Sequence, residues 1–158
     1  MTDKKAIKLS INGDAHEVLI DTRHTLLQVL REQLALTGTK CGCNNGVCGS
    51  CTIMIDDLPV RACLTLAVTA TESEIITIEG LESNGELHPV QKAIVEHQGL
   101  QCGFCTPGMV IAAKALLDKN PNPSLDEIRD ELGGNLCRCT GYVKIADAIL
   151  SLTPGGLA

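Results

Sequence analysis

The chain is organised around residues 40–51, which read Lys-Cys-Gly-Cys-Asn-Asn-Gly-Val-Cys-Gly-Ser-Cys. This stretch places four cysteines and three glycines within twelve residues. Cys43, Cys48 and Cys51 follow the spacing C-x4-C-x2-C. Eleven residues then separate Cys51 from Cys63. Thiolates gathered in this way are typical of a metal centre.

The spacing is that of a plant-type [2Fe-2S] site, in which one loop provides three thiolates and a later residue provides the fourth. Glycine suits such a loop because it tolerates positive φ and lets the backbone approach the sulfurs. Backbone N–H groups can then point at the negative charge of the cluster. We interpret the loop with Cys63 as an electron-carrying site; a zinc knot or free thiols are the alternatives.

Length and composition restrict what else the chain can be. Its 158 residues suffice for one ordinary domain or two small ones, and 44% of them are apolar. Phe104 and Tyr142 are the aromatic residues, so the core must consist of Leu, Ile, Val and Ala. Small domains with such cores are marginal without a staple such as a bound metal.

The charge pattern and the missing motifs exclude several classes of function. The net charge is −6 and there is no Lys/Arg run, which argues against nucleic acid as a partner. We expect no transmembrane helix, no membrane insertion and no signal segment, and therefore a cytoplasmic protein. No Gly-x-Gly-x-x-Gly or P-loop pattern and no nucleophile–base set occurs, so we place no catalytic residue for chemistry at carbon in this chain.

The first half of the chain predicts a small mixed sheet holding a helix. A hairpin with an Asn12-Gly13 turn is expected over 6–20, a helix over 25–36, a strand over 52–56, a turn at 57–59, a returning strand over 60–63 and another strand over 75–78. The returning strand would carry Cys63 back beside the loop. This order resembles the β-grasp fold of plant-type ferredoxins.

The second half predicts helices. After a polar linker at 81–87, helices are expected from Pro89 to 97, from Thr106 to about 118, from a capping box at Ser124 to Gly133, and after Gly141 to about 150. We therefore expect an α+β protein, with a ferredoxin-like domain over 1–80 and a four-helix bundle domain over 81–158.

Nine cysteines without a signal segment argue for metal rather than disulfides. A second group of four comes as two pairs, C-x2-C and C-x-C, each just before a predicted helix, where the helix dipole favours thiolate: Cys102, Cys105, Cys137 and Cys139. A thioredoxin-type dithiol at the first pair would leave the second unexplained, and zinc is the other alternative. Cys41 is left without a ligand role.

These motifs identify a specific resemblance. The segments 101–108, Gln-Cys-Gly-Phe-Cys-Thr-Pro-Gly, and 134–142, Gly-Asn-Leu-Cys-Arg-Cys-Thr-Gly-Tyr, together with the loop at 42–52, resemble the iron–sulfur subunit of the xanthine oxidase family of molybdenum hydroxylases. The likeness spans nearly the whole chain. It implies two [2Fe-2S] clusters, the first held by Cys43, Cys48, Cys51 and Cys63 and the second by Cys102, Cys105, Cys137 and Cys139.

The resemblance also implies roles beyond the eight thiolates. Gln101 would hydrogen-bond the pyranopterin, and Cys139 would be the ligand nearest to it, where electrons arrive. The molybdopterin cofactor would lie on a large subunit and FAD on a medium subunit of a heterotrimer, with electrons passing between them one at a time. Arg138, between two ligands, either raises the potential of the second cluster or pairs with an acid or a partner.

Two functions therefore remain at this point. The first is the electron-transfer subunit of a molybdenum hydroxylase, whose substrate chemistry lies on another subunit. The second is a free-standing ferredoxin-like carrier or redox sensor with a helical domain that binds partners. The four histidines are dispersed and are expected to be structural or exposed: His16, His24, His88 and His97.

Overall fold

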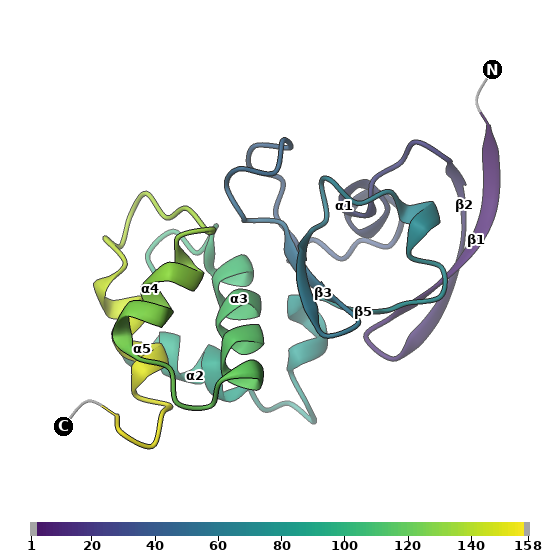
Figure 1. The fold of residues 1–158 in the computed structure, drawn as a ribbon. Coiled ribbons are helices and arrows are strands. Elements are labelled where there is room, and N and C mark those ends of the chain that lie inside the picture. The colour runs from purple at the N-terminus through teal and green to yellow at the C-terminus, as the bar shows by residue number, and fades with distance from the viewer. Residues whose placement is uncertain (1–2, 157–158) are drawn as a thin grey trace.

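A computed structural model describes residues 3–156; the outermost residues of the two expected domains, 1–2 and 157–158, lie outside the described residues. Five strands form one mixed sheet in the order β2-β1-β5-β3-β4. Figure 1 shows the sheet and α1 on one side of the molecule and the helices α2 to α5 on the other. Among the described residues, no helix is both long and apolar enough to cross a membrane.

The first hairpin confirms the prediction for 6–20. Strands β1 (Lys4–Ile11) and β2 (Asp14–Asp21) pair antiparallel around Asn12 and Gly13, which have φ values of 56° and 85°. Two consecutive residues with positive φ match the right-handed twist of a hairpin. Strand β1 then pairs in parallel with β5 (Glu74–Ile76), which makes the sheet mixed.

The helix expected over 25–36 is shorter and less regular than predicted. It begins as expected at a capping box, in which Thr25 and Gln28 bond each other's backbone N–H groups. The α-helical turn α1 (Leu26–Gln28) passes directly into a π-helical turn, η1 (Val29–Gln33). Ala35 has a φ of 56°, which turns the chain out of the helix toward the cysteine loop.

The second hairpin turns earlier than predicted. Strands β3 (Thr52–Ile55) and β4 (Leu58–Arg61) are joined by Asp56 and Asp57, both with positive φ, which aspartate tolerates better than most residues. Pro59, expected in the turn, lies within β4. Proline is accepted there because β4 is the edge strand of the sheet. The strand expected over 75–78 also ends early, at Ile76.

Short 3₁₀ helices complete the first half and lead into the second. They are η2 (Ala67–Thr69) and η3 (Ile78–Leu81). The four predicted helices then follow: α2 (Pro89–Glu96), α3 (Thr106–Lys119), α4 (Leu125–Leu132) and α5 (Val143–Leu150). The expected first-position Pro89 and the capping box of Ser124 with Glu127 are both present.

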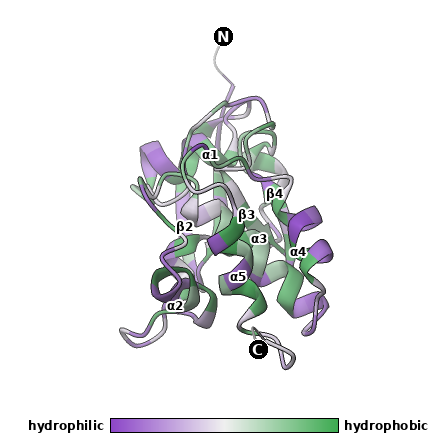
Figure 2. Cartoon of the chain, turned by 90° about the vertical axis from the view of Figure 1, so that its left-hand side faces the viewer, coloured by the Kyte–Doolittle hydropathy of each residue, from purple (hydrophilic) through white to green (hydrophobic). Residues whose placement is uncertain are grey.

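Two hydrophobic clusters lie on either side of strand β3. The first, between the sheet and α1, includes Leu9, Leu30 and Ile53. The second joins α2, α3, α4 and α5 and includes Met54, which is fully buried. Adjacent residues of a strand point to opposite faces, so Ile53 and Met54 tie β3 into both clusters. Figure 2 shows the hydrophilic residues of α4 on its outer side, away from the second cluster.

Candidate metal centres

The loop at 40–51 carries the first group of thiols and is shaped by residues with positive φ. Asn44, Gly46 and Gly49 have φ values of 55°, 84° and 71°. At Gly42, a Cβ atom would lie 2.9 Å from the Sγ of Cys48, so a side chain there would push into the thiols. The glycines predicted to let the backbone approach the sulfurs therefore do so at Gly42.

The sulfur of Cys43 accepts hydrogen bonds from the backbone. The N–H groups of Asn45 and Cys48 both donate to its Sγ at 3.4 Å. These two hydrogen bonds lower the pKa of Cys43 to about 6. The loop thus stabilises negative charge on sulfur before any metal is considered. The Cys48 thiol is a further cause of the lowered pKa of Cys43, so these two sulfurs are neighbours.

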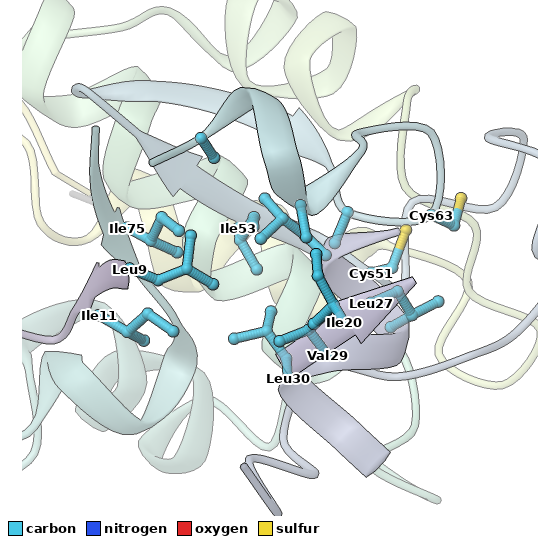
Figure 3. Packing of buried hydrophobic residues seen from close by; sticks show 14 of the residues in the cluster. Leu9, Ile11, Ile20, Leu27, Val29, Leu30, Cys51, Ile53, Cys63 and Ile75 are labelled. Carbon is cyan, nitrogen blue, oxygen red and sulfur yellow. The ribbon is translucent and has the colours of Figure 1, made fainter. Parts of the chain in front are cut away.

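Cys51 and Cys63 form the other pair of the first group. The hairpin of β3 and β4 returns the chain so that Cys63 lies beside Cys51, as the sequence predicts. Figure 3 shows both at one end of the first hydrophobic cluster, with Leu9 and Ile75 at the other end. Burial raises the pKa of Cys51 to about 11. This pair is therefore the inner side of the group.

The second group brings together four cysteines from two distant segments. The Sγ atoms of Cys139 and Cys102 lie 3.6 Å apart, and the Cys137 thiol lies close enough to Cys105 to contribute to raising its pKa. Cys105 is the N-cap of α3, as predicted. Burial raises the pKa of Cys105 to about 12, whereas the backbone N–H of Phe104 lowers the pKa of Cys102. Cys105 and Cys137 are half-buried whereas Cys102 and Cys139 are exposed, so by burial this group too has an inner and an outer pair.

The sequence predicts the second pair of cysteines at a helix N-terminus, but in the structure this pair lies before the helix begins. Cys137 and Cys139 precede the N-cap of α5, which is Tyr142, by five and three residues. Side chains of the loop, rather than the end of the helix, form hydrogen bonds with Cys137. The hydroxyl of Thr140 lies 3.1 Å from the Sγ of Cys137, and the Tyr142 hydroxyl accepts a hydrogen bond from the Cys137 N–H at 2.8 Å. Burial acts to raise the pKa of Cys137, but the bonds from Thr140 leave it lowered.

Gln101 lies at the exposed side of the second group. Its Nε2 donates to the backbone carbonyl of Cys139 at 3.1 Å, so the structure brings together the two residues singled out for cofactor contact. Cys102 and Cys139 are both exposed. Arg138 is exposed too, and among the ion pairs of the described residues none involves its guanidinium.

The paired sulfurs bear on which metal group fits. Within residues 3–156, no three or more His, Cys, Asp or Glu side chains converge on a single point that one ion would occupy. The thiols lie instead in two close pairs per group, and a [2Fe-2S] cluster takes two protein ligands at each of its two irons. The donor set and the glycine at position 42 therefore fit such a cluster. Cys41 is exposed.

Three comparisons with known proteins agree on the family. The model described as a 2Fe-2S iron-sulfur cluster binding domain matches residues 5–100, and that of a [2Fe-2S] binding domain matches residues 77–150. The nicotinate dehydrogenase small FeS subunit of Eubacterium barkeri is 47% identical over 147 residues, which are 93% of this chain and 94% of that protein. The chain belongs to the iron–sulfur small subunits of the molybdenum hydroxylases of the xanthine oxidase family.

Solved structures of this family show the same fold. Quinoline 2-oxidoreductase from Pseudomonas putida 86 contains a chain that is 50% identical, with a TM-score of 0.91 and coverage of 94% of this chain and 91% of that one. The aldehyde oxidoreductase from Desulfovibrio gigas is 44% identical with a TM-score of 0.88, but only 17% of its chain is covered. The small subunits of this family thus correspond to one part of a longer chain in other members.

The sequence did not reveal three residues that hold the thiols in place. Thr140 and Tyr142 support Cys137, and Asn135 contacts the first loop at Gly49. Asn135 belongs to the motif at 134–142, but its hydrogen-bond partner, the Gly49 carbonyl, is 86 positions away. Only a three-dimensional structure can show such a partner.

Proposed function

We propose that this chain is the electron-transfer subunit of a molybdenum hydroxylase and relays electrons between the molybdenum–pterin centre of a large subunit and the FAD of a medium subunit. The observation that carries this proposal is the pair of four-thiol groups, each divided into an inner and an outer pair of sulfurs. When bound, a [2Fe-2S] cluster supplies one-electron oxidation and reduction.

The ligands in this proposal are the eight paired thiols. Cys43, Cys48, Cys51 and Cys63 would hold the first cluster, and Cys102, Cys105, Cys137 and Cys139 the second. Backbone N–H groups at Asn45 and Cys48 already favour negative charge at the first group. The Thr140 hydroxyl does the same at the second group.

The exposed side of the second group is the proposed docking point for the large subunit. Gln101 presents an exposed amide beside Cys139, and both face solvent with Cys102. The proposed role of Gln101 is to hydrogen-bond a pterin, and that of Cys139 is to receive electrons. Support for a further subunit comes from the D. gigas aldehyde oxidoreductase, in which the matching part is 17% of a much longer chain.

The two-domain division belongs to the same proposal. We place a ferredoxin-like domain over 1–80 and a four-helix bundle domain over 81–158, supported by the two separate hydrophobic clusters. In the second, α2 packs on α5 and α3, and α4 packs on α3 and α5. A cytoplasmic location is also proposed, because cysteines assigned to metal rather than to disulfides fit a reducing compartment.

Iron and acid-labile sulfide analysis of the purified chain tests the cluster count. We expect about four irons and about four sulfides per chain, with two distinct EPR signals after reduction. About two irons, with the helical half unloaded, would overturn the proposal.

Purification of the chain from its own host under native conditions tests the partners. We expect chains that carry molybdenum and flavin to copurify with it. A chain that is fully loaded with iron but leaves the column alone is the result expected of a free-standing carrier or sensor, and it would reject the subunit role while leaving the clusters in place.

A further inference from the structure

The two cysteine groups contact each other directly through the backbone. The segment that leads into the second group, 134–137, lies against the loop of the first group at 48–52. The N–H of Leu136, the residue before Cys137, donates to the carbonyl of Cys48 at 2.8 Å. Cys48 belongs to the first group, and Leu136 is adjacent to Cys137 of the second. This bond therefore links the backbones of the two groups directly.

One buried side chain reinforces this contact. The Nδ2 of Asn135 donates to the carbonyl of Gly49 at 3.0 Å and to the hydroxyl of Thr52 at 3.3 Å. Asn135 and Thr52 are each only 2% exposed. If the two segments separated, the buried Asn135 amide would lose both acceptors, and a buried donor without a partner costs free energy. The Asn135 amide therefore holds the first loop in one position relative to the second.

Arg61 bridges the same two segments from the other side. Its guanidinium donates from Nη1 to the Thr52 hydroxyl and from Nη2 to the Gly134 carbonyl, both at 2.5 Å. The two nitrogens belong to one rigid plane, so the distance between their two acceptors is constrained. We call Arg61, Thr52 and Asn135, with the carbonyls of Gly49 and Gly134, the inter-loop clip.

The backbone segments around the inter-loop clip are closely packed. A Cβ atom at Gly49 would lie 2.4 Å from the Gly134 carbonyl oxygen, and one at Gly108, at the start of α3, would lie 2.4 Å from the Gly49 carbonyl oxygen. Three stretches of backbone therefore meet within contact distance. Phe104 of the second group also lies over the first loop, 3.5 Å from where a Gly42 Cβ would be.

We propose that Asn135 and Arg61 are positioning residues that set the separation of the two thiol groups, and with it the coupling between the centres they hold. The inference rests on the proposed function, because it concerns two centres in one chain. Neither residue contributes a ligand. Their action is on the loop that carries Cys48 and on the segment that carries Cys137.

The test compares Asn135→Asp and Arg61→Gln with the parent in the iron-loaded protein. Asn135→Asp keeps the shape but removes both donors, and Arg61→Gln removes the two-pronged bridge. Matched controls are Asn122→Asp and Arg129→Gln, which make the same changes at exposed positions of the helical half. Two quantities are measured: the magnetic splitting between the two reduced centres in EPR, and hydrogen exchange at the Leu136 amide.

Both clip variants should retain the parental iron content, show a smaller or smeared splitting, and exchange the Leu136 amide at least about tenfold faster. The controls should match the parent in all three. Parental splitting and parental exchange in both variants would overturn the inference, with the proposed function intact. Iron for one centre only, with no splitting in the parent, would instead overturn the proposed function and the inference together. If Asn135→Asp does not fold, Arg61→Gln alone decides by the same two measurements.

Discussion

In the proposed relay, Cys139 is the ligand at which electrons arrive. It is exposed, its Sγ lies 3.6 Å from that of Cys102, and its carbonyl holds the Gln101 amide. In the assembled enzyme, Cys139→Ser should slow reduction by substrate by at least about tenfold, since even the loss of an outer-shell partner costs that much at metal sites. Stopped-flow absorbance of the first centre measures the rate.

The matched control for Cys139→Ser is Cys41→Ser, which alters another exposed thiol that is not among the proposed ligands. It should leave the rate unchanged. If Cys139→Ser reduces the first centre at the parental rate, electrons do not arrive through this residue and the assignment is wrong.

Asp21, at the end of β2, predicts a pH-dependent stability. The side chain and backbone N–H of Arg23 donate to its carboxylate and hold its pKa well below the usual value. A carboxylate with a depressed folded-state pKa stabilises the fold above its unfolded pKa of about 3.9, and the contribution is lost as the pH falls below that value toward the folded pKa.

Asp21→Asn should therefore lower Tm at pH 7, and the difference from the parent should shrink as the pH is lowered below about 4. Thermal unfolding followed by circular dichroism across this range measures the effect. Asp14→Asn, at an exposed position of the same strand, serves as the control. A Tm difference that stays constant with pH would show that the Arg23 bonds do not stabilise the fold.

At the scale of the elements, α3 is positioned by its close approach to the cysteine loop. Gly108 lies in its first turn, and a Cβ there would come 2.4 Å from the backbone oxygen of Gly49. Alanine normally stabilises a helix relative to glycine by about 0.5–1 kcal/mol. Because the contact is with backbone, Gly108→Ala should instead destabilise the protein, by about 1–3 kcal/mol.

Chemical denaturation measures the change in the free energy of unfolding for Gly108→Ala. Gly155→Ala is the control, because the nearest atom to its added Cβ is 3.9 Å away and the change should be within about 0.5 kcal/mol. A stabilised Gly108→Ala variant would mean that α3 and the loop separate easily. That result would also argue against the inference drawn from the inter-loop clip.

For the whole molecule, strand β3 is the element that joins the two hydrophobic clusters. Met54 is fully buried in the cluster of the helical half, although its strand belongs to the sheet. Met54→Ala should therefore cost about 2–5 kcal/mol, and it should loosen both halves together. Hydrogen exchange resolved by residue measures both effects.

The expected result for Met54→Ala is faster exchange in β1 and β5 as well as in α2 and α3. The control is Ile7→Ala, which removes a buried side chain from the first cluster only. If Met54→Ala accelerates exchange in the helices alone, the two halves are independent units and the chain does not unfold cooperatively.

The sequence by itself determined the two thiol groups and the kind of each main element. Iron–thiolate sites restrict their ligands to short local spacings, so C-x4-C-x2-C is legible without a structure. Hairpin and helix periodicities are also local, which is why β1 and β2 and the four helices α2 to α5 were predicted nearly to the residue. The turn at Asp56-Asp57 was misplaced because Pro59 was assigned to the turn, whereas an edge strand accepts proline. The π-helical turn at Val29–Gln33 was not predicted either.

Only the tertiary structure decided how the two groups face each other. The clip bonds that join its two segments link residues 73 to 86 positions apart in the chain. Asparagine, arginine and glycine at such positions carry no periodic signal, and their effect depends on burial and on a distance of a few ångströms. Spacing along the chain marks each local set of thiols, whereas folding brings the sets together and fixes how close one group comes to the next.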